Sequence, residues 1–152
     1  MVRRNLSEEL KKAGHQLLLA TDALDMQAQG AMWVYSQALQ DWRYYLVTSL
    51  VDSIGRRKTY RLLLNVFERV EFPKDMTIED IHLGSPNESF FQLVSKVMRV
   101  EGGTIASFED CKFNNVSFNG IVYRAVRSIP SKREAERIEK RFQKKVKDLI
   151  DQ

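Results

Sequence analysis

Two pairs of neighbouring strand-like segments constrain this sequence more than any other feature. The first pair covers 32–35 and 42–51, which are rich in aromatic and aliphatic residues and are separated by the polar connector 36–41. Aromatic and β-branched residues favour strands, and a short polar connector between two such runs is typical of a hairpin. The pair therefore predicts two antiparallel strands. A helix over 31–40 is the alternative interpretation.

The second pair lies within 104–126, where phenylalanine recurs every five residues at Phe108, Phe113 and Phe118. A five-residue period is the pattern of a pentapeptide solenoid. Three copies make only fifteen residues, however, and repeat architectures need several stacked units to bury a core. The solenoid is therefore the weaker interpretation of this segment.

A hairpin accounts for the same residues with a two-residue turn at 114–115. Asparagine tolerates the positive φ angle that a type I′ turn requires at both central positions. The resulting register pairs Phe113 with Val116 and Cys111 with Phe118, so that all four side chains share one face. The alternation breaks at 119–120, which predicts a bulge there.

Four further segments show the three- and four-residue apolar spacing of amphipathic helices. They cover about 6–26, a stretch after Gly55, a stretch that ends before Gly102, and 131–152, where Ser131 and Glu134 can form a capping box. A weaker strand-like segment lies at 77–83. The expected order is α-ββ-α-β-α-ββ-α. It predicts an α+β fold with an antiparallel sheet of four to five strands and helices packed on one face.

Composition agrees with a globular protein and excludes several classes. The chain has 152 residues, of which 43% are hydrophobic and 29% are charged, as in an average globular domain. We expect a single α+β domain over 1–130, with the basic helix 131–152 packed on it or on a partner. One cysteine, Cys111, excludes an internal disulfide, and two histidines favour neither a zinc site nor any other metal or cofactor.

The lengths of the apolar runs indicate where in the cell the protein is expected. The longest runs are four or five residues, far below the roughly 20 needed to span a bilayer. No apolar stretch follows the Arg pair at 3–4, because charged residues at 8–9 and 11–12 interrupt it, so no signal peptide is expected. We expect a cytoplasmic protein without a membrane partner.

Parts of the chain resemble a known family. Ala31-Met-Trp-Val-Tyr is followed by a Trp42-Arg strand, a Gly55-Arg helix start and, near the end, a Tyr123-Arg strand. Together these resemble a family of small prokaryotic α+β proteins of uncharacterised function. The match covers about a third of the chain, and Ser49 and Arg56 stand where the family often has proline. The resemblance supports the first hairpin and implies no activity.

A cluster of cations lies at an unusual position after Gly55. Arg56, Arg57, Lys58 and Arg61 occupy the first turns of the expected helix, with no acidic residue between Asp52 and Glu68. Cations at a helix N-terminus oppose the helix dipole, whereas a bound anion would reverse that effect. The cluster predicts an anion site for a phosphate or a nucleotide. Solvated side chains are the alternative interpretation.

The last helix carries most of the net charge of +4. Residues 131–152 hold eight Lys and Arg against five Asp and Glu, and Arg133, Arg137, Arg141, Lys144 and Lys145 stand out among them. Such a surface fits nucleic acid or an acidic protein. The narrow apolar stripes of the first and last helices also fit contacts with a protein partner or within a homo-oligomer.

Evidence for an enzyme is thin. Asp110 and Lys112 flank Cys111 on one side of a strand, as in the acidic-x-Lys element of some nucleases, and Asp75 or Asp80 would be the second metal carboxylate. The sequence favours a binding or assembly module of unknown ligand, with an anion site near Gly55. A nucleic-acid-associated protein is the second hypothesis, and a metal-dependent nuclease the third. We expect no catalytic residue.

Overall fold

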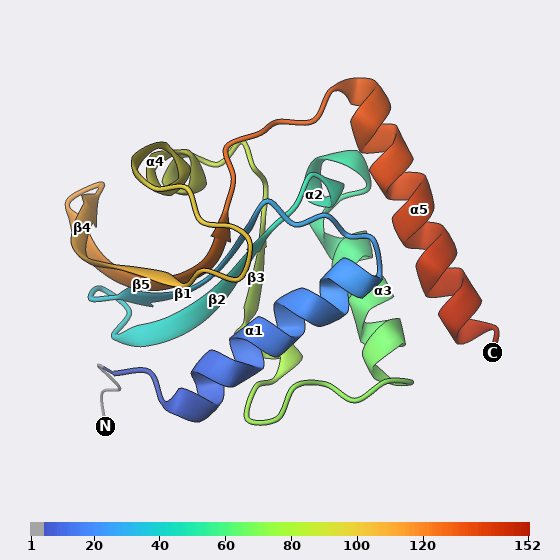
Figure 1. Cartoon of the computed structure of the whole chain (residues 1–152), viewed down its shortest axis with the longest axis horizontal. Helices are drawn as coiled ribbons and strands as arrows, with labels where there is room; N and C mark the ends of the chain where they lie inside the picture. Colours follow the sequence, from blue (N-terminus) through green and yellow to red (C-terminus); the bar gives the residue numbers. More distant parts are fainter. Residues whose placement is uncertain (1–4) are drawn as a thin grey trace.

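The computed structural model describes residues 5–152 and has an α+β architecture (Figure 1). A curved sheet is flanked by helices on both faces. The helices are α1 (Glu8–Ala23), α2 (Leu50–Ser53), α3 (Arg56–Phe67), α4 (Ser89–Val97) and α5 (Lys132–Ile150). The strands are β1 (Gly30–Ser36), β2 (Asp41–Val47), β3 (Ile81–Gly84), β4 (Ala106–Phe113) and β5 (Val116–Ala125). The predicted order of elements is confirmed, with α2 added.

The sheet has five strands in the order β3-β2-β1-β5-β4, with β1 at its centre. Four strands pair antiparallel, but β3 runs parallel to β2. The sheet is therefore mixed and not purely antiparallel as predicted. The reason is the connection: α2 and α3 lie between β2 and β3 in the chain, and a helical crossover returns the next strand in the same direction.

The first hairpin is confirmed by the pairing of β1 with β2, in which Trp33 lies opposite Tyr44. The alternative of a helix over 31–40 is wrong. Strand β2 ends at Val47, earlier than expected, because the chain turns into the short helix α2 at Leu50. The segment predicted as a strand at 77–83 begins as a 3₁₀ turn over Ile78–Asp80 and becomes β3 only at Ile81.

The second hairpin has the predicted two-residue turn. Asn114 and Asn115 have φ angles of 50° and 64°, and Phe113 pairs with Val116. The solenoid is therefore wrong. The bulge lies in β4, between Phe108 and Cys111, on the strand opposite the predicted position.

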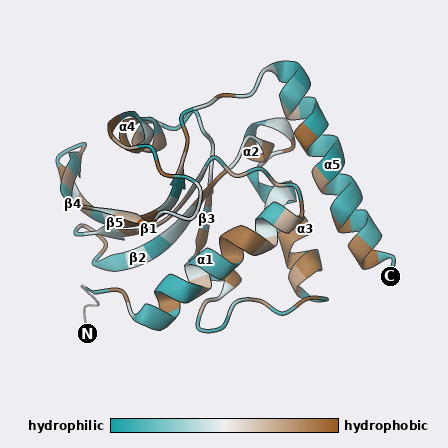
Figure 2. Ribbon diagram, viewed as in Figure 1, coloured by the Kyte–Doolittle hydropathy of each residue, from teal (hydrophilic) through white to brown (hydrophobic). Residues whose placement is uncertain are grey.

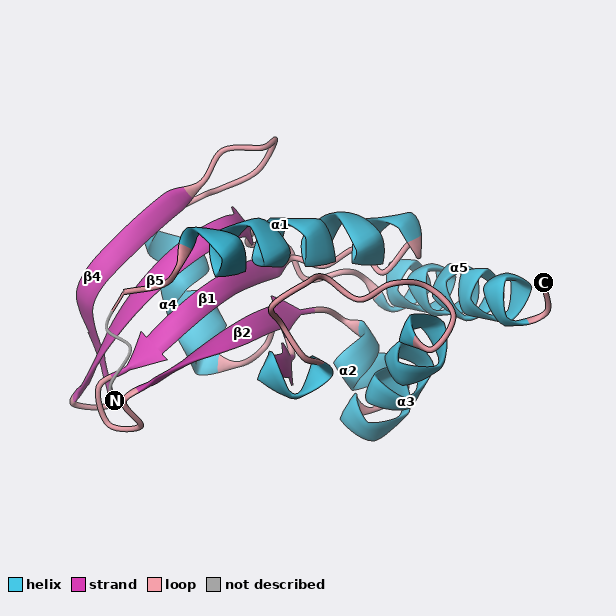
Figure 3. Ribbon diagram, turned by 90° about the horizontal axis from the view of Figure 1, so that it is seen from below, coloured by secondary structure: helices cyan, strands magenta, loops and turns pink. Residues whose placement is uncertain are grey.

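The helices cover two faces of the sheet, which corrects the expectation of one covered face. Helix α4 lies within the concave side, where the β4–β5 hairpin curls around it, while α1 crosses the other side (Figures 1 and 3). Strand β1 is buried along its whole length. Its even residues Met32 and Val34 face α4, and its odd residues Trp33 and Tyr35 face the larger core. A strand buried on both faces needs helices on both sides.

Helix α1 is fastened to the sheet by β5. The Tyr123 hydroxyl donates a hydrogen bond to the Lys11 carbonyl at 2.6 Å. The Arg124 guanidinium donates two to the Asp22 carboxylate, at 2.8 and 2.9 Å. Bidentate pairs of this kind fix geometry as well as energy. The Tyr-Arg segment that carries the family resemblance therefore positions the first helix.

Helix α5 packs on the domain beside α2 and α3 (Figure 1). It begins with the predicted capping box, in which Ser131 accepts from the Glu134 backbone N–H. Ile138, Phe142 and Val146 are buried in the same core as α1 and α3. The chain thus has one large core that includes its last helix.

Candidate functional site

Arg56, the first residue of α3, is engaged by the fold. Its Nε donates a hydrogen bond to the Leu83 carbonyl at 2.7 Å, and its Nη2 donates one to Glu88 Oε1 at 2.9 Å. Glu88 is the N-cap residue of α4, so the guanidinium joins the starts of two helices to the end of β3. An incoming anion would have to compete with Glu88 for Arg56.

His82 lies beside this pair. Its Nε2 is 3.8 Å from Glu88 Oε2, and its ring centroid is 4.7 Å from that of Tyr45. Burial lowers the pKa of His82 more than Glu88 raises it, and Arg56 and Arg43 lower it further. The imidazole is therefore favoured in its neutral form, which does not add to an anion site.

A second polar link lies at the carboxyl ends of β2 and β3. The Ser85 hydroxyl is within 2.9 and 2.7 Å of the two Asp52 carboxylate oxygens and accepts a hydrogen bond from the Asn87 backbone N–H. A hydroxyl that donates to a carboxylate and accepts from the backbone is held in place. Without a histidine hydrogen-bonded to Ser85, this arrangement joins α2 to the β3–α4 loop and does not form a nucleophile–base pair.

The other three predicted anion contacts, Arg57, Lys58 and Arg61, are exposed on α3. Arg57 and Arg61 border a shallow hollow that Tyr60 and Leu64 also line, and no residue of α5 lines it. The Tyr60 hydroxyl donates to the Ile81 carbonyl and accepts from the Leu83 N–H. The surface around Arg57 and Arg61 is therefore open, and the Tyr60 hydroxyl beside it links α3 to β3.

The residues of the nuclease hypothesis do not form a metal site in the described part of the chain. Asp110 lies at the β4 bulge with a φ angle of 51°. Its backbone N–H donates to Asn119 Oδ1 at 2.8 Å, and its carboxylate accepts from Ser117 at 3.3 Å. Within residues 5–152, no three His, Cys, Asp or Glu side chains gather closely enough to hold a metal ion.

The basic residues of α5 separate into two groups. Arg133, Arg137, Arg141 and Lys144 are exposed to solvent. Lys145 is exposed as well, but its Nζ lies 4.0 Å from Oδ2 of Asp25, in the turn after α1. Figure 2 shows that most of α5 is hydrophilic, apart from the side that faces the core. Lys145 therefore differs from the other four in having a carboxylate nearby.

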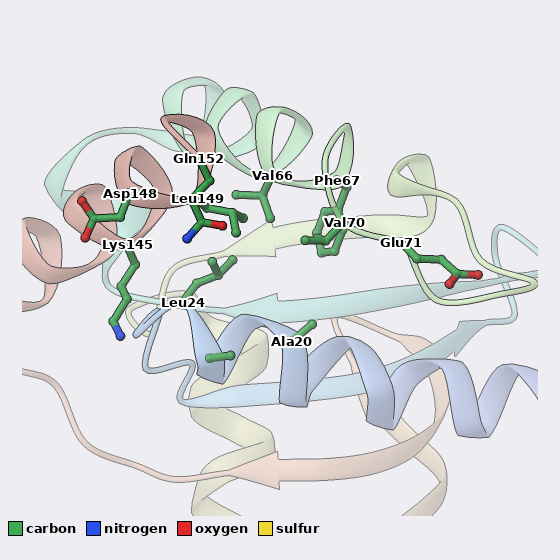
Figure 4. Close-up of a pocket in the computed structure, with 11 residues that line it drawn as sticks. Ala20, Leu24, Val66, Phe67, Val70, Glu71, Lys145, Asp148, Leu149 and Gln152 are labelled. Atoms are coloured by element: carbon green, nitrogen blue, oxygen red, sulfur yellow. The ribbon is translucent and has the colours of Figure 1, made fainter.

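A hollow lies where α1, α3 and α5 meet, and we call it the terminal-helix cleft (Figure 4). It has a volume of about 490 Å³. Its floor is apolar and comes from all three helices and the turn after α3: Ala20, Ala23, Leu24, Val66, Phe67, Val70 and Leu149. Figure 4 shows Ala20 and Leu24 pointing across the cleft toward Val66, Phe67 and Leu149.

Charged groups lie only at the edges of this cleft. Lys145 and Asp148 stand at one end, on α5, and Glu71 stands at the other (Figure 4). None of the three is buried. An apolar floor with a polar edge is the usual composition of a binding site. The chemistry that the cleft offers is non-covalent capture of an apolar group.

Sequence reasoning missed the cleft, although one signal pointed to it. Ala20 and Ala23 lie one turn apart on α1, and such small residues leave room for another group. Val70, on the opposite wall, is 38% exposed, but only the structure shows this. The third wall of the cleft comes from α3.

Comparisons of the chain with family models, with curated proteins and with solved structures found no match. No helix within residues 5–152 is long and apolar enough to cross a membrane. The site must therefore be understood from its own geometry, which is that of an open cleft with an apolar floor and charged ends, placed between the first and last helices.

Proposed function

We propose that this protein is a small cytoplasmic binding or assembly module that accepts apolar side chains of a protein partner in the terminal-helix cleft. The observation that carries the proposal is the apolar floor left open between α1, α3 and α5. The single, half-buried thiol of Cys111 agrees with a reducing compartment.

The shape of the cleft favours a partner helix. It is open toward solvent and continues into a second hollow lined by Glu68, Arg69 and Leu149. An amphipathic helix laid in such a groove inserts side chains at three- and four-residue intervals. Val70, which lines the cleft, is exposed and would be covered by the same partner. Burying its side chain would contribute roughly 1.5–3 kcal/mol at most.

An anion site at the start of α3 is not part of this proposal. Arg56 already pairs with Glu88, and the remaining cations there lie on an open surface. The nuclease hypothesis is left out because the described residues contain no metal cluster.

The test fills the cleft and follows an apolar fluorescent probe, anilinonaphthalene sulfonate. Ala23→Phe places a ring in the cleft at a position that is exposed, so the fold is expected to tolerate it. Ala38→Phe, in the exposed β1–β2 turn, is the matched control. We expect the native protein and the control to enhance probe fluorescence, and Ala23→Phe to lose at least half of that enhancement.

Equal fluorescence of both variants, with unchanged circular dichroism, would show that the probe binds elsewhere and that the cleft is not the binding site. Sedimentation over a concentration series then identifies the partner. A dimer that Ala23→Phe dissociates would mean that the partner is a second copy of the chain.

A further inference from the structure

A continuous row of cations runs along the solvent side of α5, and we call it the α5 cationic row. It consists of Arg133, Arg137, Lys140, Lys144 and Lys147, at steps of four, three, four and three residues. All five are exposed. These steps keep side chains on one face of a helix, and the buried residues Ile138, Phe142 and Val146 define the opposite face.

The row is only partly balanced by carboxylates of α5: Glu136 lies four residues before Lys140, and Asp148 lies four residues after Lys144. None of its members forms an ion pair with a residue that the structure describes, whereas Lys145, off the row, approaches Asp25. Like charges three and four residues apart repel and destabilise a helix mildly. A bound polyanion would remove this repulsion.

We propose that the α5 cationic row binds the phosphate backbone of a nucleic-acid duplex without sequence preference. Its length supports a polymeric anion: the fifteen residues from Arg133 to Lys147 span about 21 Å, because each of the fourteen steps between them rises about 1.5 Å. That distance matches about six base-pair steps of 3.4 Å. Lysine and arginine are the usual contacts to phosphate oxygens.

The composition of the row distinguishes nucleic acid from an acidic protein. The row holds no apolar or aromatic residue, whereas protein interfaces depend on such anchors at their centre. Phosphate-backbone binding needs only the charges. The row lies on the side of α5 away from the core, so it is separate from the terminal-helix cleft. The basic residues of α3 are not included, because the hollow beside them contains no α5 residue.

The test measures fluorescence anisotropy of a labelled 20-base-pair DNA duplex of random sequence, between 50 and 200 mM NaCl. Five phosphate contacts predict a slope of log affinity against log salt of up to about −4.5. The double variant Arg137→Gln/Lys144→Gln should flatten the slope by about 2 and weaken binding about tenfold. Both side chains are exposed, so the variant should remain folded.

The matched control is Arg57→Gln/Arg61→Gln, which removes the same charge from the exposed face of α3. We expect it to weaken binding less than twofold. Equal weakening by both variants would mean that net charge alone attracts the duplex, and would overturn the proposal. Absence of binding at 50 mM salt would also overturn it. Equal or tighter binding of poly-glutamate by the native protein would favour an acidic protein instead.

Discussion

The hydroxyl of Tyr44, at the centre of β2, donates a hydrogen bond to the backbone carbonyl of Gly14, in the middle of α1, with the two oxygens 2.8 Å apart. Tyr44 is fully buried. This hydrogen bond, together with those from Trp33 and Tyr123, fixes the height of α1 above the sheet. The position of α1 in turn sets one wall of the terminal-helix cleft, which begins six residues further along the helix at Ala20.

Removing this hydroxyl should loosen α1. Tyr44→Phe is expected to lower the free energy of unfolding by about 1 kcal/mol, because a buried hydrogen bond is lost without a change of packing. Urea denaturation measures the effect. Tyr45→Phe, on the other face of the same strand, is the matched control and should change the unfolding free energy by less. Equal losses from both variants would contradict the role given to the Gly14 contact.

A side chain at Gly14 should separate α1 from the sheet. An added Cβ would lie 2.6 Å from Trp33 Nε1 and 2.8 Å from the Tyr123 hydroxyl. Both groups donate hydrogen bonds to α1 carbonyls, so neither can move away without losing one. Gly14→Ala should therefore destabilise the protein by about 2 kcal/mol despite alanine's higher helix propensity. A thermal midpoint equal to or above that of the native protein would refute this packing.

The buried tyrosines predict loss of stability in alkali. Burial raises the pKa of Tyr44 and of Tyr123 well above the usual value. Above pH 10 the unfolded chain loses these protons while the folded chain keeps them, so the free energy of unfolding falls as pH rises. Absorbance at 295 nm should show these phenolates appearing only together with loss of circular dichroism. Reversible titration of all five tyrosines in the folded protein would contradict the prediction.

The His82 side chain predicts that stability also decreases in mild acid. Its pKa is lowered in the folded state, chiefly by burial, so the unfolded chain binds a proton first as pH falls below about 6.5. Stability should be complete above that pH and should decrease from there down to the lowered pKa. Urea midpoints at pH 7.5 and 5.5 measure the change. His82→Gln should reduce the difference between the two midpoints, and an unchanged difference would assign it to other groups.

Helix α5 should contribute to global stability. Phe142 is fully buried against the main core, so Phe142→Ala should cost about 3–5 kcal/mol through lost burial and the cavity left behind. Lys140→Ala on the same helix, which is exposed, should be nearly neutral. A small effect of Phe142→Ala in chemical denaturation would mean that α5 is a separable appendage.

The hairpins show which features of the fold local sequence can predict. The register around Asn114 and Asn115 was predictable because a two-residue turn with positive φ leaves only one pairing of its flanking residues. The capping box at Ser131 was predictable for the same reason, since its partners lie three residues apart. The parallel pairing of β3 was not, because its four residues meet β2 only after two helices have intervened.

The basic residues show where prediction of the site from the sequence fails. The sequence grouped Arg56 with Arg57, Lys58 and Arg61, but Glu88, which pairs with Arg56, lies 32 residues away in the chain. The cleft was invisible for a similar reason, since its walls come from α1, α3 and α5. No short segment of the sequence contains more than one of these helices.

By itself, the sequence determined the identity and order of most elements, because propensity, caps and turns act between residues a few positions apart. Tertiary structure alone decided that α4 lies on the concave face, that Arg56 and Lys145 face carboxylates, and that α1, α3 and α5 leave an open apolar floor. These outcomes depend on which surfaces meet when the core is buried, and that free energy is shared among residues distant in the chain.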